Sequence, residues 1–254
     1  EVEPGGQEGK KRKRAGVGGG GGGGRAEMAE ATLADMLRTI EAEYRLTGAL
    51  TGRSTLRPEI LAALAGVDRR GFVPATHQQL AYADTPLPIG SGQTISQPFI
   101  VALMTDLLAP GPDDLVLEVG TGSGYQAAVL SRLAREVVSV EILAEHAARA
   151  AKRLAAAGCA NVEVHCGDGS LGWRERAPFD QIMVTAAAAR VPPALIEQLR
   201  PGGRLVIPIG PMFGPQELLL IDKDRAGVCA SRSVLGVAFV PLTGASSLPA
   251  AAGA

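Results

Sequence analysis

The chain has 254 residues, 46% of them apolar and 20% charged, with 25 basic against 26 acidic side chains. This composition fits one mid-sized globular domain with a full core. The balance of charges excludes a protein that relies on a basic surplus to neutralise nucleic-acid phosphates, and the sequence has no run of about 18 apolar residues that could span a membrane.

Residues 1–27 differ in composition from the rest of the chain. They hold 11 of the 33 glycines and six basic against four acidic side chains, which leaves 19 basic and 22 acidic residues beyond them. Because such a segment buries too little apolar surface to offset its ordering entropy, we predict a disordered, glycine-rich basic leader. Met28 immediately precedes the first helical pattern, so we expect it to be the natural start of the protein.

The three cysteines bear on the cellular setting. Cys159, Cys166 and Cys229 show no CxxC spacing and are too few for a disulfide framework or a cysteine-rich zinc site. We therefore expect no metal and a reducing, cytoplasmic setting. Cys159 and Cys166 are expected to be small buried apolar residues.

Residues 28–110 predict helices followed by an irregular substrate loop. The apolar spacing from Leu33 to Tyr44 predicts one helix, and Pro58 begins a second helix at a position that favours proline. Prolines and glycines then break the chain over residues 71–92, which is typical of irregular structure with at most short strands.

A third helix is predicted to open at Ser96. Pro98 stands in its first turn, and apolar residues continue at helical spacing to Leu108. Ser96 is the expected N-cap, a role that would by itself stabilise the helix by about 1 kcal/mol. The loop ahead of this helix also offers free backbone N–H groups at a positive dipole end, so it could instead hold a carboxylate.

Residues 111–244 predict a sheet domain. Short apolar strands alternate with helices there, which indicates a doubly wound, mostly parallel α/β sheet covered on both faces. Two later strands are expected at an antiparallel edge, and residues 245–254 are predicted to be a flexible tail. The predicted strands are Leu115–Val119, Val137–Val140, Val162–Cys166, Gln181–Thr185, Arg204–Ile209, Glu217–Ile221 and Val234–Val240, with helices around Ala127–Leu133, Ala144–Ala157 and Ala194–Leu199.

Three alternate glycines, Gly120, Gly122 and Gly124, join the first of these strands to a helix. Glycines there allow a tight turn and let a ligand approach the backbone at the carboxyl edge of the sheet. The spacing does not match a dinucleotide fingerprint, because Tyr125 occupies the place of the third glycine, and no lysine follows as a P-loop requires. Glu118, two residues ahead of the glycines, would repel a pyrophosphate but would suit the ammonium of an amino-acid tail on an uncharged nucleoside. The pattern resembles that of S-adenosylmethionine-dependent methyltransferases of the Rossmann-like class.

Two further acids stand at successive strand ends. Glu141 follows the glycines by about 20 residues, where a carboxylate can accept hydrogen bonds from both ribose hydroxyls. Asp168 ends the next strand and could accept from an adenine amino group. For each acid alone, an N-cap or a solvated loop charge explains the position equally well, but the three together with the glycine loop favour cofactor binding.

A more specific resemblance rests on several segments together. Gly92–Pro98, Glu118–Gln126 and Leu199–Pro208 are similar to those of the protein-L-isoaspartate O-methyltransferase family, and Gly92–Pro98 is the most specific of them. Phe72–Pro74 and Phe239–Thr243 match the same family. The likeness covers roughly residues 50 to 243.

The resemblance implies a class I methyltransferase fold with N-terminal helical additions, and an enzyme of protein repair. Its members transfer a methyl group from S-adenosylmethionine to the α-carboxylate of an L-isoaspartyl residue, and the ester then collapses to a succinimide. Carried over to this sequence, Ser96 is the catalytic residue. The expected cofactor contacts are Thr94, Ile95, Ser96, Glu118, Gly120, Gly122, Ser123, Gly124, Glu141, Asp168, Gly169 and Thr243.

This reaction asks little of acid–base groups, because a carboxylate with a pKa near 4 is already the nucleophile at pH 7. His77, His146 and His165 are accordingly predicted to be structural, with His146 on a helix surface. We expect a monomer that acts on isoaspartyl peptides and proteins, with no nucleic-acid or membrane partner.

Two alternatives remain open. One is a methyltransferase that acts on another acceptor, which would share the glycine loop but would give no reason for Gly92–Pro98. The other is a nucleoside-binding module without turnover, since fold alone never proves activity. Trp173 is equally suited to stack on adenine or to cover the edge of the sheet.

Overall fold

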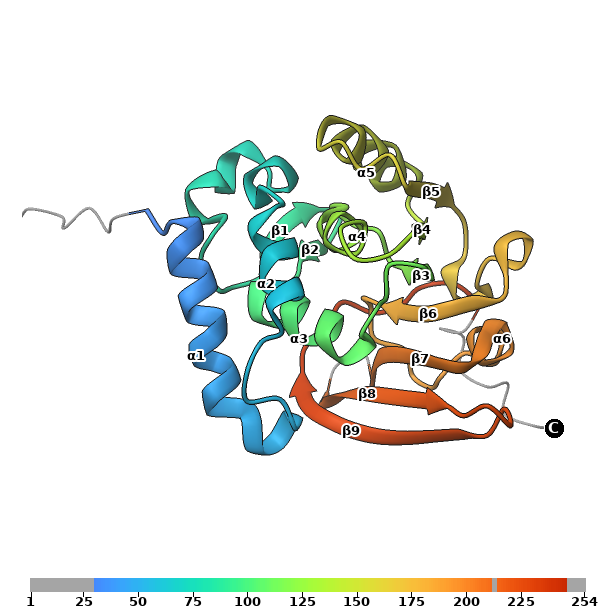
Figure 1. Ribbon diagram of the computed structural model, residues 1–254. Coiled ribbons are helices and arrows are strands. Elements are labelled where there is room, and N and C mark those ends of the chain that lie inside the picture. Colours follow the sequence, from blue (N-terminus) through green and yellow to red (C-terminus); the bar gives the residue numbers. More distant parts are fainter. Residues whose placement is uncertain (1–29, 212–213, 246–254) are drawn as a thin grey trace, which may run out of the picture.

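The computed structural model describes residues 30–211 and 214–245 (Figure 1). The predicted leader, residues 1–27, lies outside the described residues, as do residues 246–254 of the predicted tail. Among the helices of the described part, none is long and apolar enough to cross a membrane.

A seven-stranded sheet forms the centre of the molecule, in the order β5-β4-β3-β6-β7-β8-β9. Neighbours from β5 to β7 run parallel, whereas β8 and β9 are antiparallel to the strands beside them. The predicted parallel sheet with an antiparallel edge is therefore confirmed. The strands are β3 (Leu115–Val119), β4 (Glu136–Glu141), β5 (Val162–Cys166), β6 (Phe179–Val184), β7 (Leu199–Ile209), β8 (Gln216–Lys223) and β9 (Cys229–Val237).

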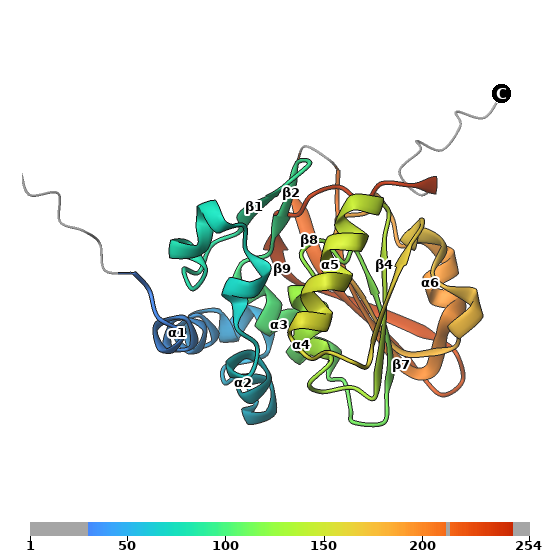
Figure 2. The same ribbon diagram turned by 90° about the horizontal axis from the view of Figure 1, so that it is seen from above.

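Helices cover both faces of this sheet, with α3, α4 and α5 on one side and α6 on the other (Figure 2). Alternate strand residues supply the two apolar clusters: Val116 belongs to the cluster under α3 and α4, and Leu117 to the cluster under α6. The strands read as continuous apolar runs because both faces are buried. The helices are α1 (Leu33–Thr51), α2 (Pro58–Ala65), α3 (Pro98–Leu108), α4 (Tyr125–Leu130), α5 (Ala144–Ala156) and α6 (Pro193–Gln198).

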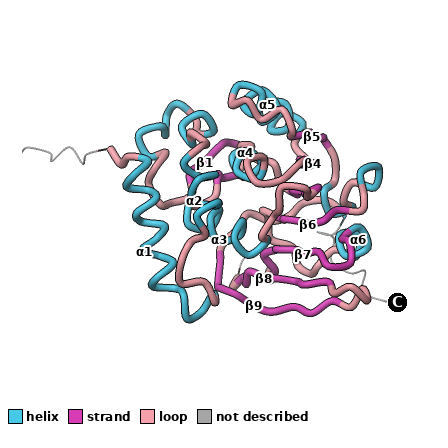
Figure 3. Tube along the Cα trace, viewed as in Figure 1, coloured by secondary structure: helices cyan, strands magenta, loops and turns pink. Residues whose placement is uncertain are grey.

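The N-terminal part is helical, while most strands lie in the C-terminal part (Figure 3). The region predicted to be irregular holds two 3-10 turns, η1 (Arg69–Phe72) and η2 (Ala75–Leu80). A small antiparallel hairpin follows, formed by β1 (Leu87–Gly90) and β2 (Gln93–Ile95). The predicted short strands are confirmed, and the hairpin brings the segment after Gly92 directly to the start of α3.

The prediction that Ser96 caps α3 is wrong. Gln97 is the N-cap residue and makes no side-chain capping bond. The carboxylate of Asp84 caps the helix instead. Its Oδ1 accepts a hydrogen bond from the Phe99 N–H (2.8 Å), and its Oδ2 accepts one from Gln97 Nε2 (2.7 Å). A residue from the preceding loop therefore satisfies the helix end, and the Ser96 side chain is not needed for it.

The last strand also differs from its predicted bounds. β9 begins five residues before Val234 and ends at Val237. Its first residues are exposed, but they pair with β8 along the sheet edge, from Cys229 opposite Lys223 onward. Edge residues that face solvent carry no apolar signal, so sequence periodicity missed them.

Candidate active site

The glycine loop leads from β3 into α4 at the carboxyl edge of the sheet. Gly120, Gly122 and Gly124 all have positive φ angles, of 97°, 51° and 90°. A Cβ atom on Gly120 would lie 2.5 Å from Thr185 Oγ1, which is closer than real atoms pack. Glycine is required there both by the backbone conformation and by the approach of β6.

A pocket opens beside this loop. It is bounded by the loop, the end of β4, the β2–α3 connection and the C-terminal strap, which we define as residues 239–243. The predicted cofactor residues that line it are Thr94, Ile95, Ser96, Gly120, Gly122, Ser123, Glu141, Gly169 and Thr243. Glu118, Gly124 and Asp168 are not among the described residues that line it.

Glu141 faces the pocket from the end of β4 with its carboxylate fixed at both oxygens. Oε2 accepts a hydrogen bond from the Gly122 N–H (2.8 Å), and Oε1 accepts from the Leu143 N–H (2.9 Å). Each oxygen has more than one acceptor site, so the carboxylate can still accept from ligand hydroxyls while the loop holds its orientation.

Glu118 lies behind the loop and is completely buried. Its Oε2 accepts a hydrogen bond from the Ser139 hydroxyl, which in turn lies 2.6 Å from Thr121 Oγ1. Within the described residues, its Oε1 has no hydrogen-bond partner. Burial raises the pKa of Glu118 to about 8, and the nearby Glu141 carboxylate acts in the same direction. Contact between Glu118 and the cofactor stays a prediction.

Asp168 serves the chain itself. Its Oδ1 accepts from the Ser170 N–H (2.9 Å) at the start of a 3-10 turn, and its Oδ2 accepts from the Ala245 N–H (2.6 Å). The alternative considered from sequence, a capping role, thus describes this carboxylate as it lies, and its contact with adenine stays a prediction. Its bond to Ala245 also fixes the residues that follow the C-terminal strap.

The C-terminal strap is held at two places. The Gln216 side chain accepts from the Phe239 N–H (2.6 Å) and donates to the Phe239 carbonyl (3.1 Å). The Leu242 N–H donates to the Ala187 carbonyl at the end of β6 (2.7 Å). These bonds carry Thr243 to the pocket, although it is distant in sequence from the glycine loop.

Ser96 stands between this pocket and a second hollow. The second hollow extends from Ser96 past Ile100 of α3 to Phe239 of the strap. Both hollows share Thr94, Ser96, Thr185 and Val240 in their walls. Ligands bound in the two hollows would therefore meet beside Ser96.

Sequence reasoning missed three polar lining residues, Thr121, Gln126 and Thr185. Gln126 Nε2 donates to Thr105 Oγ1 of α3 (2.9 Å), and Thr185 Oγ1 donates to the Gly120 carbonyl (2.6 Å). Thr185 ends a predicted strand at the carboxyl edge, a signal that could have identified it. Gln126 lies in the first turn of α4, two residues after Gly124, so its place beside the glycine loop could also have identified it.

The family model described as Protein-L-isoaspartate(D-aspartate) O-methyltransferase (PCMT) matches residues 46–247. The chain belongs to this family. A protein-L-isoaspartate O-methyltransferase 2 of Syntrophobacter fumaroxidans is 53% identical over 214 residues, which are 84% of this chain and 87% of the relative. A protein-L-isoaspartate O-methyltransferase of Methanoregula boonei is 52% identical over 195 residues, 77% of this chain and 89% of the relative.

Solved structures agree with the family. A protein-L-isoaspartate O-methyltransferase superposes with a TM-score of 0.70 at 28% identity, covering 83% of this chain and 67% of that one. A Plasmodium falciparum protein described as a protein-L-isoaspartate O-methyltransferase, solved with S-adenosyl-L-homocysteine, gives 0.67 at 22% identity over 81% of this chain and 97% of its own. At that identity, the second likeness shows the fold alone.

S-Adenosylmethionine is the cofactor of this isoaspartyl methyltransferase family, and the pocket fits it. Gly120 and Gly122 line the pocket without side chains, so a ligand can approach the backbone of the loop there. The fixed Glu141 carboxylate presents acceptors for hydroxyl groups at one end. Thr94 to Ser96 and the C-terminal strap close the side opposite the loop.

The histidines, the cysteines and Trp173, whose roles were predicted from the sequence, are not among the described residues that line either hollow. Among the described residues that line the hollows there is no histidine. His146 is buried, so the prediction that it lies on a helix surface is wrong. It belongs to the side of α5 that faces the interior of the protein. Trp173 stacks on His165 with ring centroids 4.2 Å apart, which favours its alternative role of covering the sheet edge. Cys159 is buried as expected, but Cys166 is exposed because β5 is the last strand of the sheet.

Proposed function

We propose that this chain methylates the α-carboxylate of L-isoaspartyl residues in damaged peptides and proteins, with S-adenosylmethionine as donor, and so starts their repair through a succinimide. The observation that carries the proposal is the position of Ser96 in the wall shared by two hollows. One hollow has the glycine loop and Glu141 that suit the nucleoside. The other is open to a peptide along α3 and the C-terminal strap.

The chain's own residues bind and orient, and no general base is needed. The acceptor carboxylate is already ionised at neutral pH. We propose that the Ser96 hydroxyl and nearby backbone N–H groups orient it without removing its nucleophilicity. When bound, S-adenosylmethionine supplies the methyl group to a carboxylate oxygen and leaves as a neutral thioether. Holding the two reactants in line can by itself contribute about 7 kcal/mol or more to catalysis.

In this proposal, some donor-side residues contact S-adenosylmethionine and others hold the glycine loop in place. Glu141 accepts from the ribose hydroxyls, and Thr94, Ile95 and Thr243 close the cleft around the donor. Glu118, which lies behind the loop, supports the glycine loop at Thr121 through the hydroxyl group of Ser139, and so holds the loop in place for the amino-acid tail.

A labelling assay with matched peptides tests the proposal. The chain is incubated with methyl-labelled S-adenosylmethionine and with peptides that differ only in carrying isoaspartate or aspartate. The expected result is base-labile label on the isoaspartyl peptide alone. Label on other acceptors would support the alternative methyltransferase, and calorimetric binding of S-adenosylhomocysteine without any transfer would support a nucleoside-binding module.

We also infer that the chain works as a monomer and needs no nucleic acid. The near balance of acidic and basic residues in the whole sequence supports the second part, that no nucleic acid is needed. Light scattering coupled to size-exclusion chromatography is expected to give the mass of a single chain. A dimer, or activity that depends on added RNA or DNA, would contradict this.

A further inference from the structure

Arg69 is a buried charged residue that the proposed reaction does not use. It lies in η1 and its side chain has no exposed surface. Its two hydrogen bonds go to carbonyl oxygens: Nε donates to the Ala81 carbonyl (2.9 Å) and Nη2 to the Ser96 carbonyl (2.7 Å). The Asp84 carboxylate attracts this charge but forms no ion pair with it among the described residues, so the desolvation of Arg69 is only partly offset. Packing alone would be served better by an apolar side chain.

The same guanidinium also contacts the donor side. Its Cζ lies 4.8 Å from the ring centroid of Tyr125, in the geometry of a cation–π contact. Tyr125 is the first residue of α4 and directly follows Gly124 of the glycine loop. Within the described ranges, Arg69 Nη1 and the Tyr125 hydroxyl are both buried without a hydrogen-bond partner. Arg69 therefore stands between the acceptor segment and the donor loop.

The backbone around Ser96 is held from both sides. Arg69 holds the Ser96 carbonyl, while Asp84 holds the Gln97 side chain and the Phe99 N–H. No side chain on β2 performs this task in the described contacts. The planar guanidinium suits it, because its donors point in fixed, diverging directions and can hold two carbonyl groups at once.

We infer that Arg69 is a positioning residue for methyl transfer, which fixes Ser96 on the acceptor side relative to Tyr125 behind the glycine loop. This inference rests on the proposed function. It assigns to Arg69 no contact with either substrate. Displacing reacting atoms by about 1 Å can lower the rate on the order of 100-fold. We therefore expect substitutions of Arg69 to lower kcat.

Arg69→Lys and Arg69→Gln test the inference. Neither side chain can hold both carbonyls and the Tyr125 ring, so kcat on an isoaspartyl peptide is expected to fall by about 100-fold. The calorimetric Kd for S-adenosylhomocysteine is expected to stay within about threefold, because the glycine loop itself is unchanged. The neighbouring Arg70→Gln is the matched control: Arg70 is exposed, pairs with Asp68, and is expected to leave kcat unchanged.

Hydrogen exchange of the full chain gives a second readout that needs no turnover. In Arg69→Lys, peptides covering residues 81–97 are expected to exchange faster, while those covering β4 and β5 keep their wild-type rates. A wild-type chain that does not methylate the peptide would overturn the proposed function and with it the role of Arg69 in methyl transfer. The exchange data would then test separately whether Arg69 holds residues 81–97 in place. Unchanged kcat and exchange in both variants would overturn the role of Arg69. So would losses of kcat, cofactor affinity and exchange protection that run in parallel across the whole chain.

Discussion

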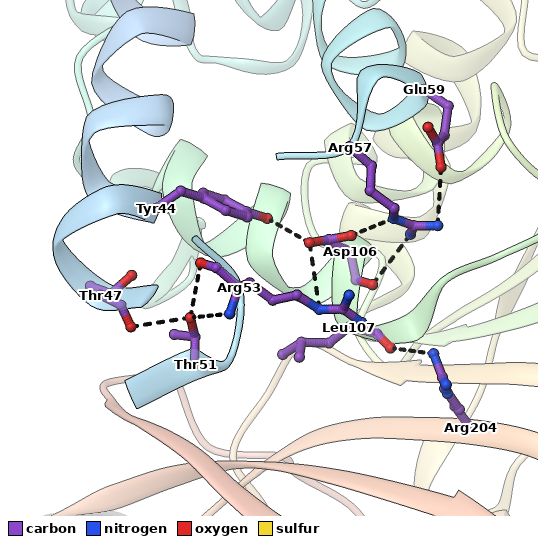
Figure 4. A network of polar contacts seen from close by, with 9 residues as sticks. All are labelled: Tyr44, Thr47, Thr51, Arg53, Arg57, Glu59, Asp106, Leu107 and Arg204. Atoms are coloured by element: carbon purple, nitrogen blue, oxygen red, sulfur yellow. Dashed lines mark hydrogen bonds and ion pairs between the residues drawn. The ribbon is translucent and has the colours of Figure 1, made fainter. Parts of the chain in front are cut away.

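Two buried ionisable groups at the site, Arg69 and Glu118, differ from the buried Asp106 at the far end of α3. Asp106 is paired with opposite charges: Arg57 donates to its carboxylate, Arg53 lies 3.8 Å away, and the Tyr44 hydroxyl also reaches it (Figure 4). Arg69 and Glu118, next to the site, have hydrogen bonds only to uncharged groups, and each keeps one unpartnered buried atom among the described residues.

This difference in ion pairing separates Asp106, which joins elements of the fold, from Arg69 and Glu118, which lie next to the site. The Asp106 network ties α1 and the chain before α2 to the last turn of α3, and Arg204 adds a bond to the Leu107 carbonyl there (Figure 4). Opposite charges in that network offset most of the cost of burial. At the site, Arg69 has the attraction of Asp84 without a direct ion pair, and Glu118 has the repulsion of Glu141, so no ion pair among the described residues offsets the burial of either group. We therefore expect Asp106 to govern stability and the site residues to govern activity.

The largest expected effect is that of Asp106→Asn on stability. It would leave Arg53 without its anion and Arg57 with only the half-exposed Glu59. Breaking a buried pair in this way costs about 3–5 kcal/mol in the free energy of unfolding. Urea denaturation measures this loss. At a temperature where the variant is still folded, kcat should match the wild type. Asp222→Asn, which breaks only the half-exposed pair with Arg204, is the control and should cost about 1 kcal/mol or less.

Glu118→Gln is expected to change how stability depends on pH. The unfolded chain loses the Glu118 proton near its ordinary pKa of 4.5, whereas the folded chain keeps it to about pH 8. The folded state binds more protons in this interval, so Glu118 makes stability fall as pH rises from about 4.5 to 8. The variant should remove this fall and be more stable than wild type at pH 8 by about 4 kcal/mol.

Urea denaturation of the ligand-free chain at several pH values measures the Glu118 effect. The exposed Glu145→Gln is a suitable control, since its carboxylate pairs only at the surface with Arg149. Parallel pH profiles for wild type and Glu118→Gln would show that Glu118 titrates normally and would remove it from the comparison with Asp106.

Ser96→Ala gives the smallest free-energy change and the sharpest test of the comparison. Loss of one hydroxyl hydrogen bond to a charged acceptor is expected to lower kcat by about 10-fold to 100-fold, or about 1.5–3 kcal/mol. Because Ser96 does not cap α3, the melting temperature and the affinity for S-adenosylhomocysteine should be unchanged. A lower melting temperature with unchanged kcat would make Ser96 a structural residue.

Much of the donor side was predictable from local sequence. The strand before Gly120 and the helix after Gly124 follow from periodicity and from backbone preference, which are properties of neighbouring residues. The same holds for the position of Glu141 at a strand end. The resemblance of Gly92–Pro98 to a known family identified the family, and the match over residues 46–247 confirms it. That this segment forms the acceptor side stays a prediction.

The sequence by itself determined the alternation of strands and helices, the glycine loop and the family. Only the tertiary structure decided that Asp84 and not Ser96 caps α3, that Glu118 lies behind the loop, and that Arg69 reaches both Ser96 and Tyr125. The reason is physical. Strand and helix patterns depend on residues a few positions apart, whereas these contacts join segments that meet only when the N-terminal helices pack against the sheet.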